Sequence, residues 1–502
     1  MTMGWWGVGL ALGVPWLAGA LWLRLLWREP APGVWPLALG YGYVLSMLGV
    51  TLLLRGMDAL GLSLGFIGPI LLFALLAVAG GRRLRQRPAV QTGDKGTMLE
   101  RTPIWQRILF GVLLLWLGLR LIGLALEIWW HPLFPWDAWT TWAVRARIWS
   151  ELHQLVPFVS PQDWLADPGG QTHTIAAWQY PATVSLLALW PTLAHGAWNE
   201  TAANLPWLGC ALALGLGFYG QARLWGASPL TSLTFLWLLL SLPLLDTHVA
   251  LAGYADLWLA TTLGLAFFAL LQWARDGDWR QGGLVLAFAL ACPFIKQEGA
   301  VWLLLFIPAL LVARLRGRWL LALLGGTIAT GAAAWTMGGV SFGVPGAGIV
   351  QLTPSLIELP YVGRFALTYH DSWDSVWRNL FVYGNWHLLT YVLALAIGWG
   401  LFAATRRGAP SWLRAGTVFV LGALSALFVL FFLTDAHLWA TKSTSINRLF
   451  LQFVPAFVFW MLTLWESRAR SAGGSAIPNL ADRDRQSPEA PLGAPTFSRP
   501  PG

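Results

Sequence analysis

The sequence predicts an all-α polytopic membrane protein with about 13 transmembrane helices. Hydrophobic residues make up 57% of the 502 residues and charged residues only 11%, whereas soluble domains carry roughly 25% charged residues. Apolar runs of at least about 18 residues, the length that a helix needs to cross a bilayer, recur along almost the whole chain. The 35 tryptophans fit the same class, because indole rings favour the headgroup layer.

The expected spans follow one another with mostly short connections. Three spans fill residues 1–80, and residues 1–27 lack the basic n-region of a cleavable signal peptide. A basic loop, a core of seven spans and a final group of three spans follow, and the proline- and serine-rich tail is expected to be disordered. The expected spans lie at about 5–23, 36–54, 60–79, 108–126, 203–222, 229–245, 257–273, 282–295, 300–313, 319–337, 382–404, 413–433 and 448–466. The remaining segments are the basic loop 81–107, the core 108–337 with its outer loop 127–202, the outer loop 338–381, the three-span segment 382–466 and the tail 467–502.

The positive-inside rule gives the orientation of these spans. Successive connections alternate between basic and basic-poor, with twenty lysines and arginines in the basic connections and eight on the opposite side. We therefore assign the basic side to the cytoplasm, which places the N-terminus outside and the C-terminus inside. The basic loops account for much of the formal net charge of +9, which does not indicate nucleic-acid binding.

The first outer loop, residues 127–202, is long but contains no expected span. Residues 138–155 are typical of an amphipathic helix whose tryptophans contact the membrane surface. Residues 181–193 are apolar but too short to cross a bilayer comfortably, so we expect an interfacial or re-entrant segment there. The second outer loop is first rich in glycine and proline, then polar and aromatic.

Ionisable side chains gather at the outer ends of the spans. Charge is costly near a membrane, so ionisable residues at these positions are candidates for function. With the orientation assigned above, all of them face the extracytoplasmic side. The residues are Asp137, Asp256, Lys296, Glu298 and Arg448.

These residue types suit the transfer of a group from a lipid phosphate. A carboxylate can deprotonate an acceptor or bind a divalent cation, a second can position the acceptor or share the metal, and cations can stabilise a leaving phosphate. We assign catalysis to Asp137 and Asp256, and a Mg²⁺ or Mn²⁺ ion bound by both remains an open alternative. We assign donor-phosphate binding to Lys296, Arg145, Arg147 and Arg448, with support from Glu298, Tyr254 and His248.

Each of these residues also has a purely structural interpretation. Asp137 precedes an expected helix, where aspartate is a favoured N-cap, and Asp256 can simply begin its span at the interface. Lys296 can extend towards the headgroups as an ordinary anchor, and Glu298 can do no more than pair with it. The two arginines of the first outer loop can bind lipid headgroups without a part in catalysis.

Cysteines and histidines add little to this picture. Cys210 and Cys292 both lie in expected spans, so no disulfide framework is indicated. The eight histidines fall at or near the outer face, but no two have metal-ligand spacing on one helix. That spacing does not favour a histidine zinc site.

The order of these features resembles the C superfamily of membrane glycosyltransferases (GT-C) over roughly residues 105–466. The family's hallmark acid in the first long outer loop is matched by Asp137, and its second acid, in the next short outer loop, by Asp256. The sequences that carry the resemblance are Trp136-Asp137-Ala138-Trp139, Trp178-Gln179-Tyr180-Pro181, Gly253-Tyr254-Ala255-Asp256, Lys296-Gln297-Glu298-Gly299 and Asn447-Arg448.

The resemblance implies a glycosyltransferase that uses a polyprenyl-phosphate-linked sugar on the outer face of the membrane and inverts the anomeric carbon. Members of the superfamily include protein O-mannosyltransferases, oligosaccharyltransferase catalytic subunits and bacterial aminoarabinose transferases. The chain lacks the paired Asp-Glu of the first group and the Trp-Trp-Asp of the second, so we expect a glycolipid or glycan acceptor. We therefore expect a hexosyl- or pentosyltransferase of the bacterial inner membrane.

Two other functions remain open. A transporter or flippase for lipid-linked saccharides is expected to have glycine- and proline-broken spans and polar sites near the midplane, whereas the charges here gather at one face. An O-antigen polymerase or ligase would rely on a large late outer loop, a position that residues 338–378 occupy.

Labelling of single cysteines tests the orientation, in a background without the two native cysteines. We expect positions 163 and 371 to react with a membrane-impermeant reagent from outside, and positions 94 and 316 only from the cytoplasmic side. Reaction of position 163 from the cytoplasm would invert the topology and leave the acids facing nucleotide sugars.

Overall fold

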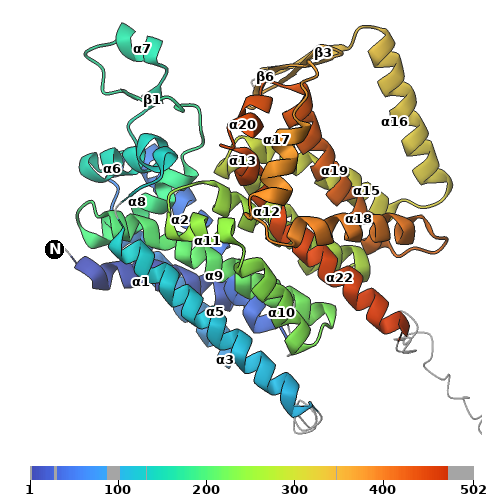
Figure 1. Cartoon of the computed structure of the whole chain (residues 1–502). Helices are drawn as coiled ribbons and strands as arrows, with labels where there is room; N and C mark the ends of the chain where they lie inside the picture. The colour runs from blue at the N-terminus through green and yellow to red at the C-terminus, as the bar shows by residue number, and fades with distance from the viewer. Residues whose placement is uncertain (1–2, 28–30, 88–101, 132, 346–347, 473–502) are drawn as a thin grey trace, which may run out of the picture.

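The computed structural model describes residues 3–27, 31–87, 102–131, 133–345 and 348–472. The centre of the expected basic loop and most of the tail that was expected to be disordered lie outside these residues. The last helix, α22 (Val454–Ala472), extends into the first residues of that expected tail. The described part is mostly helical, in agreement with the expected class (Figure 1).

Eight described helices are long and apolar enough to cross a membrane, or nine if one bent pair counts as a span. This number supports a polytopic membrane protein but does not confirm the expected count of about 13. Each of the eight coincides with one of the expected spans. They are α1 (Gly4–Arg24), α2 (Val34–Ala59), α3 (Ile67–Arg85), α5 (Ile104–Trp130), α9 (Glu200–Trp225), α12 (Asp256–Asp276), α16 (Arg318–Thr336) and α19 (Ser411–Leu433).

Most of the remaining expected spans are short or broken helices. The bent pair, α10 and α11, turns by 68°, because Pro243 begins the second helix and has no N–H to continue the first. Two further helices have only 17 residues each. The elements are α10 (Pro229–Leu240), α11 (Pro243–Ala250), α13 (Trp279–Ile295), α14 (Glu298–Leu304), α15 (Phe306–Arg314), α18 (Leu389–Thr405) and α21 (Ile446–Leu451), which precedes α22.

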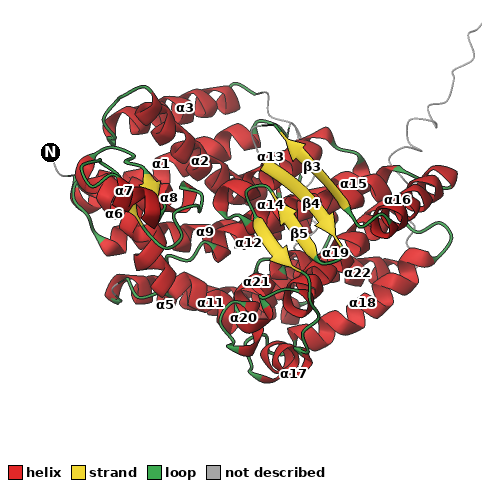
Figure 2. Ribbon diagram, turned by 90° about the horizontal axis from the view of Figure 1, so that it is seen from above, coloured by secondary structure: helices red, strands yellow, loops and turns green. Residues whose placement is uncertain are grey.

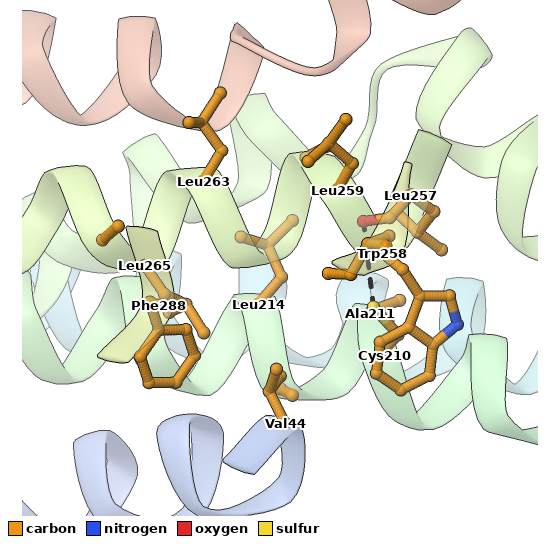
Figure 3. Close-up of a cluster of buried hydrophobic side chains, with 14 of the residues drawn as sticks. Val44, Cys210, Ala211, Leu214, Leu257, Trp258, Leu259, Leu263, Leu265 and Phe288 are labelled. Carbon is orange, nitrogen blue, oxygen red and sulfur yellow. Dashed lines mark hydrogen bonds between the residues drawn. The ribbon is translucent and has the colours of Figure 1, made fainter. Parts of the chain in front are cut away.

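Helix α12 lies at the centre of the helical core. It packs against α9, α13, α19 and α22, and 89% of its most apolar 18-residue stretch is buried. Figure 3 shows how Val44 of α2, Leu214 of α9 and Leu263 of α12 lie in successive layers of the core. Because α12 is held on several sides, the position of its first residue, Asp256, is fixed by the core.

Helices α2 and α9 approach each other closely at glycines. A Cβ atom on Gly40 would lie 2.3 Å from the backbone nitrogen of Gly217, and one on Gly220 would lie 2.3 Å from that of Leu37. Apolar helices in a membrane gain little from hydrophobic association, so close backbone contact between small residues is a common way to hold them together.

The first outer loop folds into short helices and one pair of strands. Its elements are the π-helix η1 (Ala138–Trp142), α6 (Ala143–Leu152), β1 (Phe158–Val159), α7 (Pro161–Ala166), β2 (His173–Thr174), which pairs in parallel with β1, and α8 (Thr183–His195). The expected helix at 138–155 forms over most of its length, but Trp142 and Trp149 pack into the protein rather than facing outward. The expected interfacial segment is α8, whose residues 183–194 are buried.

The second outer loop contains an antiparallel sheet that the sequence analysis did not predict. Its strands are β3 (Val340–Val344), β4 (Gly348–Thr353), β5 (Leu356–Leu359) and β6 (Gly363–Ala366), in the order β3-β4-β5-β6. Alternating apolar residues such as Val340, Phe342 and Val344 suit a strand. Viewed from above, the sheet projects over the ends of α13 and α14 (Figure 2), and Tyr361 donates a hydrogen bond of 2.7 Å to the Pro293 carbonyl.

The two expected outer loops lie on the same side of the helices. In Figure 1, α7 and β1 of the first loop and β3 and β6 of the second lie at the top of the view, while α22 runs towards the bottom. Between the sheet and α18 come α17 (Trp373–Trp377) and the π-helix η2 (Arg378–Val382), and α20 (His437–Thr441) follows α19. This arrangement is the one that alternating connections predict.

We predict that Gly40→Ala destabilises the protein, because the added methyl group meets the backbone of α9. Overpacking of this kind costs about 1–3 kcal/mol. Gly118→Ala in α5 is the matched control, since a Cβ atom at that position meets nothing within 4 Å. The measurement is the melting temperature in one detergent, and an equal melting temperature for both variants would contradict the close contact.

Candidate active site

The carboxylate of Asp256 is completely buried and is surrounded by hydrogen-bond donors. Its Oδ1 atom accepts bonds from the Lys296 ammonium at 3.0 Å and from the Gln452 amide at 2.7 Å. Its Oδ2 atom accepts bonds from the Arg448 guanidinium at 2.9 Å (Nε) and 2.8 Å (Nη2). A buried carboxylate without partners would cost several kcal/mol, so this site exists only because three side chains converge on it.

Arg448 joins Asp256 to Asp137. The same Nη2 atom lies 2.8 Å from Oδ2 of Asp256 and 2.6 Å from Oδ2 of Asp137. The side chain of Asp137 is 36% exposed, whereas that of Asp256 is 0% exposed. One carboxylate is therefore accessible to a ligand, and the other is completely enclosed.

A glycine allows these two carboxylates to approach each other. The turn before α12 contains Gly253 at φ +117°, a conformation that favours glycine. A Cβ atom on Gly253 would lie 2.4 Å from the Cβ of Ala138. The turn that leads into Asp256 thus lies directly against Ala138, which is the first residue of η1 and follows Asp137 in the chain.

Lys296 lies in the break between α13 and α14, where its backbone is extended. Its ammonium bonds both Asp256 and Glu298, the latter at 3.0 Å. Burial alone would lower the pKa of Lys296, but the two carboxylates raise it above its usual range. Gly299 permits this tight break, since a Cβ there would lie 2.2 Å from the Cys292 carbonyl oxygen. The pairing of Glu298 with Lys296 occurs as considered above, and Lys296 is buried rather than extended towards lipid.

Aromatic rings border the charged residues. The Arg448 guanidinium lies 4.3 Å from the centre of the Tyr254 ring, and the centre of the His248 ring, in α11, lies 5.1 Å from that of Tyr254. Tyr180, part of a quoted motif but not assigned to the site, stacks on Trp142 at 5.3 Å. Burial raises the pKa of Tyr180 to about 12, and the carboxylates around it contribute to that rise. Its phenol is therefore protonated at neutral pH.

Gln452 is a site residue that the sequence analysis missed. It donates to Asp256, and its own carbonyl oxygen accepts a bond of 2.6 Å from the Trp302 indole. A signal was present, because Gln452 is the lone polar residue in the apolar run 449–459 and lies four residues after Arg448. Residues at this spacing share one helix face.

Arg145 and Arg147 are not part of this cluster. Arg145 is buried, and its guanidinium donates to the backbone carbonyls of Ala177, Trp178 and Tyr180. It therefore holds the turn that carries Tyr180, while burial lowers its pKa only to about 10 and leaves it charged. Arg147 points elsewhere and pairs with Glu151 at 2.9 Å. The structure thus gives neither arginine a contact that would support the expected phosphate role.

Asp137 does not cap the helix that follows it. It precedes η1 but makes no side-chain capping bond, so the capping interpretation is wrong.

A divalent cation shared by Asp137 and Asp256 does not fit this site, because each oxygen of Asp256 already accepts bonds from cationic or amide donors. The guanidinium that joins the two carboxylates would also repel a cation. We therefore derive no step through a metal at this position.

No protein-family model matches this chain, and no curated protein or solved structure matches it either. The family resemblance described above therefore rests on the quoted motifs alone.

We predict that Asp256→Asn destabilises the protein far more than Asp137→Asn. Asparagine at position 256 keeps the shape but removes the fully buried counter-charge of Lys296 and Arg448, which retain only their partly exposed partners Glu298 and Asp137. Breaking a buried ion pair costs about 3–5 kcal/mol. Asp137 is partly exposed, so water can solvate the groups that its replacement leaves without a charged partner, and the loss of stability is smaller. Melting temperatures of the two variants provide the comparison, and a larger loss for Asp137→Asn would contradict the difference in burial between the two acids.

Proposed function

We propose that this protein is a membrane glycosyltransferase that moves a sugar from a polyprenyl-phosphate-linked donor to an extracytoplasmic glycolipid or glycan. The observation that supports the proposal is the convergence of Asp137, Asp256, Lys296 and Arg448 from four segments far apart in the sequence. These segments meet at the ends of apolar helices, on the side that the arginine distribution assigns to the outside. A polyprenyl phosphate carries its charged group at that depth in the membrane. The proposed location is the inner membrane of a bacterium, with the active site facing outward.

In the proposed reaction, Asp137 is the general base. Of the two acids it is the accessible one, and its carboxylate contacts the Arg448 guanidinium at 2.6 Å. The acceptor oxygen or nitrogen attacks the anomeric carbon and loses its proton to Asp137. The bond between that carbon and the phosphate oxygen breaks, and its electron pair leaves with the polyprenyl phosphate. Attack opposite the leaving group inverts the anomeric carbon.

Arg448 and Lys296 bind the donor phosphate in this proposal. A guanidinium offers several N–H donors in one plane, which suits a phosphate. When the phosphate binds, it competes with Asp137 for the Nη2 atom of Arg448 and frees the base. The Lys296 ammonium supplies the second positive charge as the phosphate leaves.

Asp256 acts as a positioning residue rather than as a second acid or base. Both of its oxygens are occupied by Lys296, Arg448 and Gln452. Its charge keeps the two cations in place and preserves their spacing while the donor is absent. This role replaces the catalytic assignment made from the sequence.

We predict that Asp137→Asn reduces sugar transfer to background with little change in melting temperature. General bases contribute about 10²–10⁴-fold to a rate, and asparagine cannot accept the acceptor proton. The measurement is transfer by the purified protein from a polyprenyl-phosphate-linked sugar to a bacterial glycolipid acceptor. Full activity of the folded variant would remove the central assignment.

We also predict that Lys296→Ala and Arg448→Ala weaken the use of donor more than the use of acceptor. Arg448→Lys should rescue donor use only in part, because lysine retains the charge but loses the planar arrangement of donors. Arg147→Ala is the matched control, since this arginine pairs with Glu151 outside the cluster. The readout is the KM for donor at saturating acceptor in fixed detergent and salt. An unchanged KM for donor in both alanine variants would mean that these cations only neutralise Asp256 and do not bind the donor phosphate.

A further inference from the structure

A second group of ionisable side chains lies outside the proposed active site. His370 follows the sheet, Asp435 lies between α19 and α20, and His437 is the first residue of α20. One ligand atom from each of the three lies within 4.8 Å of the others. The histidines are 67 positions apart in the chain, so no sequence spacing could have revealed the group.

Backbone hydrogen bonds hold these two segments side by side. The N–H of Thr368 donates to the Leu433 carbonyl at 2.9 Å, and that of His370 donates to the Phe432 carbonyl at 2.8 Å. The rings of His370 and His437 stack with their centres 3.7 Å apart and their planes inclined by 13°.

The orientation of His437 leaves one ring nitrogen for a ligand. Its Nδ1 atom lies 3.2 Å from the Thr434 carbonyl oxygen, which can only accept, so Nδ1 is the donor and Nε2 is the ring nitrogen left for a ligand. Metal-binding histidines commonly donate their second N–H to a backbone carbonyl in this way. Asp435 is exposed and both histidines are half-buried, so the group is open to solvent.

We propose that His370, Asp435 and His437 bind a divalent transition-metal ion of the zinc class at the outer face. Two imidazoles and one carboxylate form a known ligand set for zinc, with water at a remaining position. Magnesium and calcium prefer oxygen ligands. The site is separate from the proposed active site, and the inference does not depend on sugar transfer.

The position of the ion suggests what it does for the protein. It would fasten the segment after β6 to the connection that leads from α19 through α20 to α21. Asn379 of η2 donates to the Ala440 carbonyl at 3.2 Å and to the Ser443 hydroxyl at 3.1 Å, and it accepts a bond of 2.8 Å from Asn447. Arg448 is the next residue in the chain. The metal would therefore stabilise the outer connection that places this arginine.

The test uses full-length protein purified without a histidine tag and treated with a chelator. We expect calorimetric titration to show one Zn²⁺ bound per chain, and we expect Zn²⁺ but not Mg²⁺ to raise the melting temperature. The variants His370→Ala, His437→Ala and Asp435→Asn should each weaken Zn²⁺ binding by at least about tenfold. His387→Asn is the control, because it removes an exposed outer histidine with positive φ that asparagine tolerates.

Asp435→Asn keeps the experiment informative if a histidine variant fails to fold, because the aspartate is exposed and its replacement is nearly isosteric. Equal Zn²⁺ affinity in wild type and in the folded ligand variants would overturn the proposal. So would weakening by His387→Asn as large as that by the ligand variants, or the absence of stoichiometric binding to the wild type.

Discussion

A buried carboxylate needs a counter-charge and hydrogen-bond donors within contact distance, and the cluster of charged residues around Asp256 meets that requirement. Asp256 is the first residue of α12, which is the most buried of the eight candidate membrane spans in the described part of the chain, and its side chain has no exposed surface. An uncompensated charge there would be costly on the scale of the stability of a whole protein. Lys296 supplies the compensation from the break between α13 and α14, and Arg448 and Gln452 supply it from α21 and the residue that follows it. The requirement of one residue thus fixes the positions of three others.

The same arrangement leaves one carboxylate, that of Asp137, accessible at the surface of the cluster. Arg448 has more than one donor and can bond both Asp256 and Asp137. The enclosed acid bonds the arginine through two of its nitrogens, whereas the accessible acid contacts one of them, and we propose that an anionic ligand replaces this second contact. Tyr180, kept in place by Arg145 through its backbone carbonyl, adds a protonated phenol beside the charges. The result is a polar site at a helix end. Its inner carboxylate, Asp256, is fully bonded, and its outer carboxylate, Asp137, is partly exposed.

Close backbone approaches make this geometry possible. Gly253 lets the turn before α12 lie against η1, and Gly299 lets α14 begin immediately after Lys296. Both glycines belong to motifs that were singled out for their charged residues. Their role is steric, since any side chain at either position would separate the segments that carry those charges.

Several parts of this arrangement could be predicted from the sequence. Alternating basic loops place Asp137, Asp256, Lys296 and Arg448 on one side, and a common side is the first condition for their contact. The roles of Arg145 and Gln452 could not be predicted in the same way, because they depend on a turn at 177–180 and on the packing of Trp302. The expected span count is not confirmed, because prolines and short polar breaks divide several of the apolar runs, as at Pro243. The outer sheet was missed because its alternating residues stand among glycines and prolines.

The central claim is that Arg448 exchanges its bond to Asp137 for a lipid phosphate while Asp256 stays fully bonded. The most direct test is an experimental structure of the protein in a lipid nanodisc with bound polyprenyl phosphate. We predict that the phosphate contacts Arg448 and Lys296, that Asp137 loses its contact with Nη2, and that Asp256 retains its bonds to Lys296, Arg448 and Gln452. A phosphate bound away from both cations, with the bond between Asp137 and Arg448 intact, would contradict the account.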